Sequence, residues 1–418
     1  MKRRLFLILL AACLGLSACQ AQGPADAPEE APGRAPEETA EPAPADLPAL
    51  PDLPASEAMG FSELDSRLIA YLSENGLAEE SFTVSPLSYK AALALTALGA
   101  EGETQRQILD ALGFADTDEL TAWYATVLVG VADFDGRIAG KDKASCAYRV
   151  VNAIFHNAAC DGAFRETYQD LVAQKLAARA SSHAADEITD AINSWVSDQT
   201  NGMIPFLVED ASQSAAVLVN ALYLKTLWPE AFDESPLTDF TTVSGEKVQK
   251  EFITRTAKFD YYSDDACQLV ILPLQGGVKM AVVLGDAGGL SEKLSAANTR
   301  KVRVTIPKFE VETSLDKKEL VDYLKSIGCG RMFIDGGAQF DPMFTEGIYV
   351  DDIIQKAKVK VDENGLEAAA ATAVIMMRNT ALPNPEEPVD FTADQPFRFV
   401  IYREDAAPEL LFWGQIMK

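Results

Sequence analysis

The side chains that most often perform catalysis are scarce or isolated in this sequence. It contains two histidines, His156 and His183, and neither has the metal-binding spacing of two histidines four residues apart on a helix. A nucleophile elbow, a phosphate-binding loop and a dinucleotide-binding glycine motif are all missing. Ser85 precedes Pro86, but no base can be named for it, so a buried hydrogen-bonding role is favoured. The sequence therefore predicts no catalytic residue, no metal site and no cofactor.

Residues 363–374 offer a different kind of chemistry, because they can adopt two conformations. The alanine run favours a helix, since alanine loses no side-chain entropy there. In a strand, one face of the segment would be small or apolar throughout and could enter a sheet between existing strands. The residues of that face are Leu366, Ala368, Ala370, Thr372 and Val374. Gly365 lies just before them and can act as a hinge.

Short motifs surround this segment and extend upstream along the chain. Before it stand Ser85-Pro86-Leu87-Ser88 and residues 99–104, 192–196, 200–204, 218–223, 306–309 and 324–328; after it stand residues 391–399 and 411–414. In these motifs and their order, roughly residues 57–418 resemble the serpins. The resemblance implies an α+β serpin fold, in which a helical cap lies over three β-sheets and a reactive-centre loop is exposed.

The alanine run resembles the proximal hinge of that loop. The resemblance assigns the hinge to Glu363, Gly365, Leu366, Glu367, Ala368, Ala369, Ala370, Ala371 and Thr372. It implies that a serine protease attacks the loop and forms an acyl-enzyme. The cleaved loop then inserts into the main sheet as an extra strand and carries the distorted protease to the far pole. Residues 365–379 span roughly 46 Å as a strand, which is enough to cross a sheet.

The bond that the protease cuts is placed by counting from Glu363. The spacing usual in inhibitory serpins puts it between Asn379 and Thr380, and a cut one residue earlier puts it between Arg378 and Asn379. Arginine before the bond suits a trypsin-like enzyme, whose pocket carries a carboxylate. Asn379 leaves elastase-like, subtilisin-like and papain-like enzymes open, so inhibition of cysteine proteases stays an alternative.

Two positions differ from the usual pattern of inhibitory serpins. Such members carry Thr or Ser where this chain has Leu366, and excess volume can cost roughly 1–3 kcal/mol on insertion. Gln355 stands where the family has histidine; it still donates and accepts hydrogen bonds, but a histidine's pH sensitivity is lost. The resemblance places it in a cluster that controls sheet opening, made of Ser85, Ser88, Asn220, Gln355 and Trp228. A surface lipoprotein with a serpin fold that binds a ligand or partner without trapping proteases therefore stays an alternative.

The periodicity of apolar residues predicts the elements that must position these side chains. In the first half of the body it predicts helices at 61–72, 88–98, 105–112, 164–177 and 186–196. After Ser214, β-branched and aromatic residues predict strands at 216–225, 258–262, 267–274, 278–284, 301–312 and 397–403. Helices first and strands later indicate one α+β domain over residues 57–418.

The first 56 residues differ in composition from this body. Residues 1–18 have the charged and apolar regions of an export signal, and the following Cys19 resembles the lipidated residue of a bacterial lipoprotein box. Residues 19–56 are rich in Pro, Ala and acidic side chains, which predicts a disordered tether. We therefore expect an exported protein, lipid-anchored at the bacterial cell surface, with the periplasmic face as the alternative.

Charge and cysteine content limit the partners. The formal net charge of −27 argues against nucleic acid, because phosphate binding needs clustered Lys and Arg. The cysteines of the body are Cys146, Cys160, Cys267 and Cys329; none belongs to a CxxC pair, so disulfides are permitted but not required. The expected partners are serine proteases, and the membrane through the lipid anchor only. The protein is expected to act as a monomer.

Overall fold

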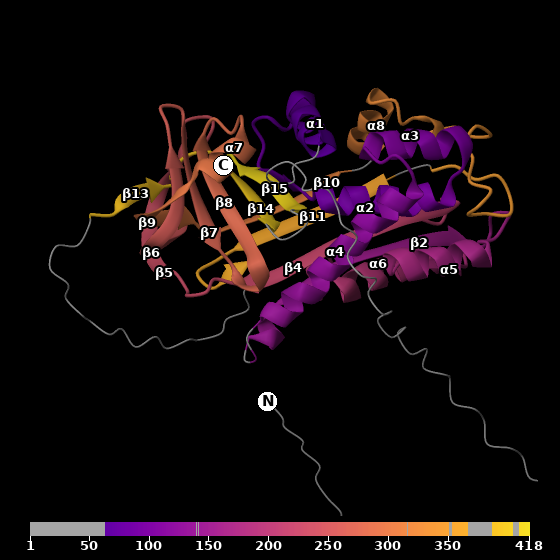
Figure 1. Cartoon of the computed structure of the whole chain (residues 1–418), viewed down its shortest axis with the longest axis horizontal. Coiled ribbons are helices and arrows are strands. Elements are labelled where there is room, and N and C mark those ends of the chain that lie inside the picture. Colours follow the sequence, from indigo (N-terminus) through magenta and orange to yellow (C-terminus); the bar gives the residue numbers. More distant parts are fainter. Residues whose placement is uncertain are drawn as a thin grey trace, which may run out of the picture. The chain divides into compact units, whose positions relative to one another are not determined.

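A six-stranded sheet forms the centre of the computed structural model, which describes residues 63–138, 140, 142–315, 317–350, 353–366, 387–403 and 409–418. We call it the main sheet. Its strands run in the order β10 (Phe309–Leu315), β11 (Ile353–Val361), β12 (Gly365–Leu366), β4 (Ala216–Leu227), β2 (Ala147–Asn157) and β3 (Arg179–His183) (Figure 1). Buried and more exposed residues alternate along β11, so one face of this strand lies on the core.

The other strands in the described part of the chain form a nine-stranded network. Its order is β1 (Phe82–Val84), β15 (Glu409–Ile416), β14 (Phe397–Arg403), β8 (Val278–Gly285), β7 (Cys267–Pro273), β6 (Lys247–Ser263), β9 (Asn298–Pro307) and β13 (Val389–Thr392), with β5 (Asp233–Thr241) paired to β6. The start of β6 pairs with β5, and its residues 260–263 pair with β7. Two of the three expected sheets therefore share this one long strand.

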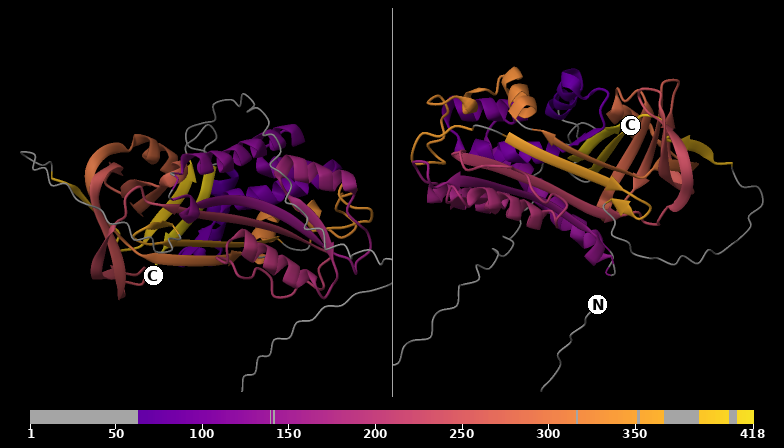
Figure 2. Two further views of the ribbon diagram at one scale, coloured as in Figure 1. Left: turned by 90° about the horizontal axis from the view of Figure 1, so that it is seen from below. Right: turned by 180° about the vertical axis from the view of Figure 1, so that it is seen from behind.

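Some of the helices pack on the two faces of the main sheet, whereas α7 packs on β6 and β7. The helices of the described residues are α1 (Glu63–Leu72), α2 (Pro86–Gly99), α3 (Gly102–Leu112), α4 (Thr117–Arg137), α5 (Glu166–Leu176), α6 (Ile188–Gln199), α7 (Leu290–Ala296) and α8 (Asp322–Ser326). Short helical turns lie at Ser73–Leu77, Lys143–Ser145, Gln275–Gly277, Lys317–Val321 and Arg331–Phe333. Figures 1 and 2 show α2 and α6 on opposite sides of the main sheet.

Two apolar cores account for this arrangement. Every residue of α2 is buried, and the helix begins where the Ser85 hydroxyl caps the backbone N–H of Ser88 and Pro86 takes the first helical position. On the other face, α6 presents Ile188, Ile192 and Val196 at helical spacing to the sheet. The part of β2 and β4 that lies against α6 is thus buried on both faces. Farther along, β11 directs Lys356, Lys358 and Lys360 away from the core, so a strand added beside it would bury one face and leave the other partly exposed.

The expected helices and most expected strands are confirmed, but one helix was not predicted and two expectations about the strands were wrong. The helix α4 was not predicted, although the Asp116 carboxylate caps its first turn by accepting from the backbone N–H groups of Asp118 and Glu119. The first half of the body, which was expected to be mostly helical, also contains the long strand β2, so strands already occur before Ser214. The strand expected at 301–312 is interrupted at Lys308 and forms β9 and β10.

Two further observations concern the membrane and the thiols. Of the helices in the described ranges, none combines the length and the apolar character needed to cross a bilayer. The four cysteines of the body are free thiols, so no disulfide contributes to the described part of the fold.

Candidate functional site

A tight turn at the end of β11 begins the predicted hinge. The Asp362 carboxylate accepts hydrogen bonds from the backbone N–H groups of Asn364, at 2.7 Å, and Gly365, at 3.3 Å. The backbone N–H of Asp362 donates in turn to the Gly365 carbonyl at 3.1 Å. Burial raises the pKa of the Asp362 carboxyl. The turn reverses the chain, so that Leu366 pairs with Val361 in an antiparallel arrangement.

The two residues of β12 are already inserted between β11 and β4. Gly365 pairs with Leu227 and Leu366 with Thr226, and the Leu366 side chain is only 3% exposed. A Cβ at position 365 would overlap the Thr226 carbonyl oxygen and would lie 2.7 Å from the Leu227 Cα. Glycine is therefore required by the close approach of the two backbones.

Residues just after β4 stabilise the hinge turn by hydrogen bonds to its carbonyl groups. The backbone N–H of Trp228 donates to the Asn364 carbonyl, and its indole N–H donates to the Asp362 carbonyl, each at 2.9 Å. The backbone N–H of Phe232 donates to the Glu363 carbonyl at 2.8 Å. Trp228 was expected in the cluster with Ser85, but it lies at the hinge, just after β4 ends at Leu227.

Lys308 pairs with the hinge from the turn between β9 and β10. Its ammonium lies 2.8 Å from a Glu363 carboxylate oxygen, 2.8 Å from Glu234 and 3.5 Å from Glu251. The hydrogen bond from Lys308 lowers the pKa of Glu363. Burial opposes the charged form of Lys308, but its carboxylate partners outweigh burial and raise its pKa.

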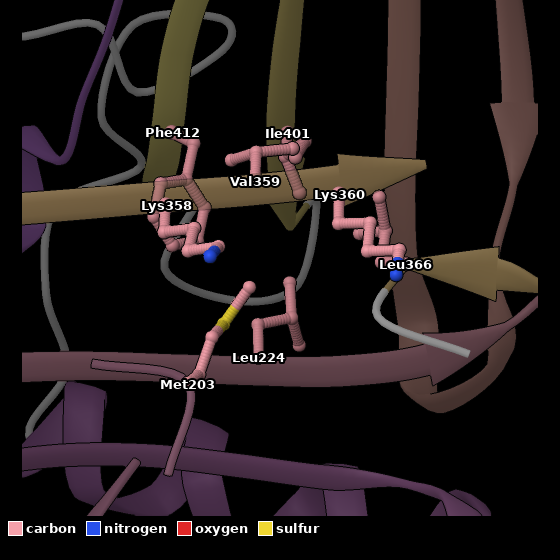
Figure 3. Close-up of a pocket in the computed structure, with 8 residues that line it drawn as sticks. All are labelled: Met203, Leu224, Lys358, Val359, Lys360, Leu366, Ile401 and Phe412. Atoms are coloured by element: carbon pink, nitrogen blue, oxygen red, sulfur yellow. The ribbon is translucent and has the colours of Figure 1, made fainter. Parts of the chain in front are cut away.

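Beyond β12, the two central strands of the main sheet separate. At one end β11 and β4 pair in parallel at Ile353 with Leu218 and Ile354 with Val219, and at the other end β12 lies between them. Across residues 355–360 and 220–225, all of them described, the two strands make no backbone pairing. Figure 3 shows this gap, which is lined by Met203, Leu224, Lys358, Val359, Lys360, Leu366, Ile401 and Phe412.

Four of the five residues predicted to control sheet opening lie together at the far end of the gap. The Gln355 side chain on β11 makes two hydrogen bonds to the backbone of Ser85. Its amide N–H donates to the Ser85 carbonyl at 2.8 Å, and its amide oxygen accepts from the Ser85 backbone N–H at 3.2 Å. The Ser88 hydroxyl donates to the Asn220 amide oxygen on β4. All four side chains are buried. The cluster connects α2 to both strands that border the gap.

Two further residues of this hydrogen-bonded chain, Asn152 and Tyr124, were not predicted from the sequence. The Asn220 amide donates to the Asn152 oxygen on β2, and the Asn152 amide donates to the Tyr124 hydroxyl on α4. Burial raises the pKa of Tyr124. An asparagine inside the apolar run at 150–155 is a signal that could have identified Asn152, but Tyr124 had no signal because its helix was not predicted.

Some predicted site residues lie outside the described residues. These are the hinge residues 367–372, the two candidate scissile bonds formed by Arg378, Asn379 and Thr380, and the lipidation site Cys19.

The histidines have structural environments. His156 is 2% exposed, its Nδ1 lies 3.1 Å from the Ser182 hydroxyl, and its ring packs edge-on against Phe164 and Phe344. Burial lowers its pKa. In the described part of the chain, neither histidine is paired with Ser85, whose hydroxyl caps α2. The geometry thus supports the prediction that Ser85 is structural.

Comparison with known proteins agrees with this geometry. Residues 62–418 match the family model described as Serpin (serine protease inhibitor). The chain is 32% identical over 389 residues to Serpin-ZXA of Oryza sativa subsp. japonica, covering 84% of this chain and 94% of the relative. It is 32% identical over 372 residues to a serine protease inhibitor of Cyanea capillata, covering 81% and 92%.

Solved structures show the same fold. The thyroxine-binding globulin complex with thyroxine aligns with a TM-score of 0.70 and 20% identity, and the alignment covers 85% of this chain and 97% of that one. The α+β architecture and the helices on both faces of the main sheet are those of the serpin fold. The description of the family and the names of the relatives support protease inhibition as the general activity. The chain belongs to the serpin family.

Proposed function

We propose that this protein irreversibly inhibits serine proteases as a suicide substrate, by inserting its cleaved reactive-centre loop into the main sheet. The observation that carries the proposal is the unpaired gap between β4 and β11, which begins where β12 ends. A strand that continued β12 would run antiparallel to both neighbours. Backbone N–H and C=O groups on both edges of the gap would then gain partners.

The register of β12 determines where each later residue would lie. Extending it residue by residue places Ala368 beside Leu224 and Val359, and Ala370 beside Leu222 and Ala357. These neighbours are buried on the core face, so the alternate residues of the loop that enter it must be small or apolar. The alternation from Leu366 to Val374 meets this requirement.

The same register gives specific partners to two polar loop residues. Thr372 would lie beside Asn220 and Gln355, so its hydroxyl would reach the buried cluster that ends the gap. On the opposite face, Glu367 would lie between Lys225 and Lys360, and the three charges would attract one another. Both placements favour insertion over release of the loop.

In the proposed mechanism, the catalytic groups that cleave the loop are those of the protease. Its serine attacks the carbonyl carbon of Asn379 or Arg378 and forms an ester, while the following residue leaves with a free amino group. Insertion then competes with attack of water on the ester. Each new ladder hydrogen bond contributes a net of about 0.5–1.5 kcal/mol, and two edges gain them together. The insertion is therefore strongly favourable once the loop is cut.

The proposal includes the cell surface as the site of action. An export signal at residues 1–18, lipidation of Cys19 and a tether over 19–56 would hold the inhibitor on the bacterial surface. There it would meet proteases from outside the cell.

The test is incubation with trypsin-like, elastase-like and subtilisin-like proteases, followed by denaturing gels and mass spectrometry. We expect a denaturant-resistant covalent complex and a released C-terminal peptide beginning at Thr380 or Asn379. Clean cleavage without a complex for every serine and cysteine protease tried would overturn the proposal and favour the non-inhibitory alternative. A sharp rise of the unfolding temperature after cleavage within 375–381 would show that the loop inserts.

A further inference from the structure

One face of the sheet that β6, β9 and β13 form is open to solvent. Along β9, more exposed and buried residues alternate, so that Lys301 and Arg303 lie on the open face while Val302 and Val304 lie on the core. Such alternation is typical of a sheet with one solvated face. In the described part of the chain, β13 pairs with β9 alone and forms the edge of this sheet. The open face therefore reaches the strand at which the chain returns from the loop.

Positive charge gathers on this open face, although the whole chain carries a net charge of −27. Lys258 on β6 lies directly opposite Lys301 on β9, and Arg300 is exposed beside them at the start of β9. Arg303, farther along β9, pairs with Asp390 on β13 at 3.0 Å. Like charges directly opposite each other on neighbouring strands destabilise a sheet. Local violations of this kind are expected at functional surfaces.

Lys258 and Arg300 have no ion-pair partner in the described part of the chain. No carboxylate oxygen there lies within 4 Å of the Lys258 ammonium or of the Arg300 guanidinium. Asp260, two positions beyond Lys258 on β6, accepts a hydrogen bond from the Thr299 hydroxyl at 2.6 Å. Both basic side chains are exposed, so their charges are available to a partner.

We propose that this open face docks an acidic patch on the surface of the protease that attacks the loop, with Lys258 and Arg300 as the principal contacts. The inference rests on the proposed function, because its occupant is the attacking protease. Complementary charge steers the encounter of two proteins and fixes their orientation. Since the chain as a whole is acidic, the open face is where an acidic patch would be attracted and not repelled.

The place of the open face relative to the loop supports this occupant. Val389, the first residue of β13, pairs with Val302, two positions after Arg300. With strands about 4.8 Å apart and a rise of about 3.3 Å per residue, the Cα atoms of Arg300 and Lys258 lie on the order of 10 Å from that of Val389. The loop thus rejoins the described fold beside the two cations.

A protease that attacks either candidate bond is held close to this point. Asn379 precedes Val389 by ten positions, and an extended chain of that length spans on the order of 35 Å at most. That reach is about the diameter of a small folded domain. The rim of a bound protease is therefore within reach of β9.

The test measures the second-order rate constant for loop cleavage, because cleavage is seen whether or not the protease is then trapped. The probe is a subtilisin-like protease in two forms, unmodified and with its lysines succinylated, which replaces ammonium groups with carboxylates. Each rate is divided by the rate of the same form on a short peptide. At low ionic strength we expect the succinylated form to cleave the Lys258→Gln/Arg300→Gln protein at least about threefold more slowly than the parent, and added salt should abolish this difference. The unmodified form should show a smaller loss.

Two further variants separate charge from structure. Lys258→Arg/Arg300→Lys keeps both charges and should retain the parental rate. Lys175→Gln/Arg179→Gln is the matched control, because it removes one lysine and one arginine from exposed positions on α5 and β3. Figure 1 shows α5 at the opposite end of the body from β13, so this control should be cleaved at the parental rate.

The inference is overturned by a parental rate for Lys258→Gln/Arg300→Gln, by an equal loss in the control variant, or by an equal loss for both forms of the protease. It is also overturned if the double variant binds a sulfated polysaccharide less tightly than the parent but is cleaved at the parental rate, since the open face would then bind a polyanion. Cleavage without a covalent complex contradicts trapping alone. A failure of the proposed function is therefore distinguishable from a failure of this inference.

Discussion

Lys308 and Glu363 form a 2.8 Å ion pair that joins the turn between β9 and β10 to the turn between β11 and β12. The first turn connects the nine-stranded network to the main sheet, and the second lies within the main sheet. The two residues are 55 positions apart in the sequence. Within the described residues, Glu363 is also held through its backbone carbonyl, which accepts from Phe232, and through its carboxylate, which accepts from the Asn364 amide. The ion pair is therefore a main restraint on the side chain that precedes the loop.

Removing this restraint should loosen the hinge without unfolding the body. We expect Glu363→Gln to destabilise the intact protein by about 1 kcal/mol and to speed amide exchange at Asn364 and Gly365. Glu234→Gln is the control, since it takes a more exposed carboxylate from the same lysine and leaves the hinge residue in place. Equal exchange rates in the two variants would show that the ion pair does not restrain the turn.

Gly365→Ala should expel β12 from the main sheet. Its Cβ would overlap the Thr226 carbonyl oxygen, and neither backbone can move without breaking β-pairing. We expect a loss of about 1–3 kcal/mol in the free energy of unfolding, measured with urea. Gly245→Ala provides the comparison, because that glycine also has a positive φ but nothing within 4 Å of its Cβ position. Similar losses in both variants would mean that backbone strain alone, and not the contact with β4, is responsible.

Tyr124→Phe should weaken the link between α4 and the cluster at the end of the gap. The Asn152 amide would lose its acceptor in a buried site, which costs about 1–2 kcal/mol. We expect a lower unfolding midpoint in urea and faster amide exchange at Asn220. Tyr262→Phe, which removes an exposed hydrogen bond to Asp264, should change neither quantity. A Tyr124→Phe protein with parental exchange at Asn220 would contradict the link.

A buried charge cluster predicts a pH-dependent effect of Glu409→Gln. Lys90 lies 3.3 Å from Asp65 and 3.6 Å from Glu409, and the Trp123 indole donates to Glu409 at 2.7 Å, so two carboxylates share one ammonium. Burial raises the pKa of Glu409 above its unfolded value. Its ionised form therefore lowers stability as the pH rises through the folded pKa, and this penalty is absent below the unfolded pKa.

We accordingly expect Glu409→Gln to raise the unfolding temperature near pH 8 and to change it little near pH 4. Thermal unfolding measured across this range checks the sign. Lys90→Met is the opposite control, because it takes the ammonium away from the buried Glu409 carboxylate and should destabilise the protein by about 3–5 kcal/mol at pH 8. A benefit of Glu409→Gln that grows toward acid pH would contradict the assignment.

Periodicity was a good guide to elements that are buried on one side or that lie in the core. The apolar spacing from 186 to 196 predicts α6, and the β-branched runs at 267–274 and 278–284 predict β7 and β8 almost to the residue. It failed for α4, whose apolar residues are interrupted by glycines and acidic side chains and which is stabilised by tertiary contacts such as Phe134 with Tyr148. It also found only the end of β6, because charged residues dominate the rest of that strand.

Residue types and order were enough to predict a segment that can enter a sheet, because Gly365 is followed by small or apolar residues at alternate positions. The resemblance to the serpins added the cluster of Ser85, Ser88, Asn220 and Gln355. The sequence did not indicate that β4 and β11, about 130 residues apart, lie beside each other and pair directly at one end of the gap; the three-dimensional arrangement shows it. Strand pairing is non-local, so no local pattern encodes a gap between two strands. For the same reason the ion pair of Lys308 with Glu363 and the contact of Trp228 with the hinge could be seen only once distant segments were brought together.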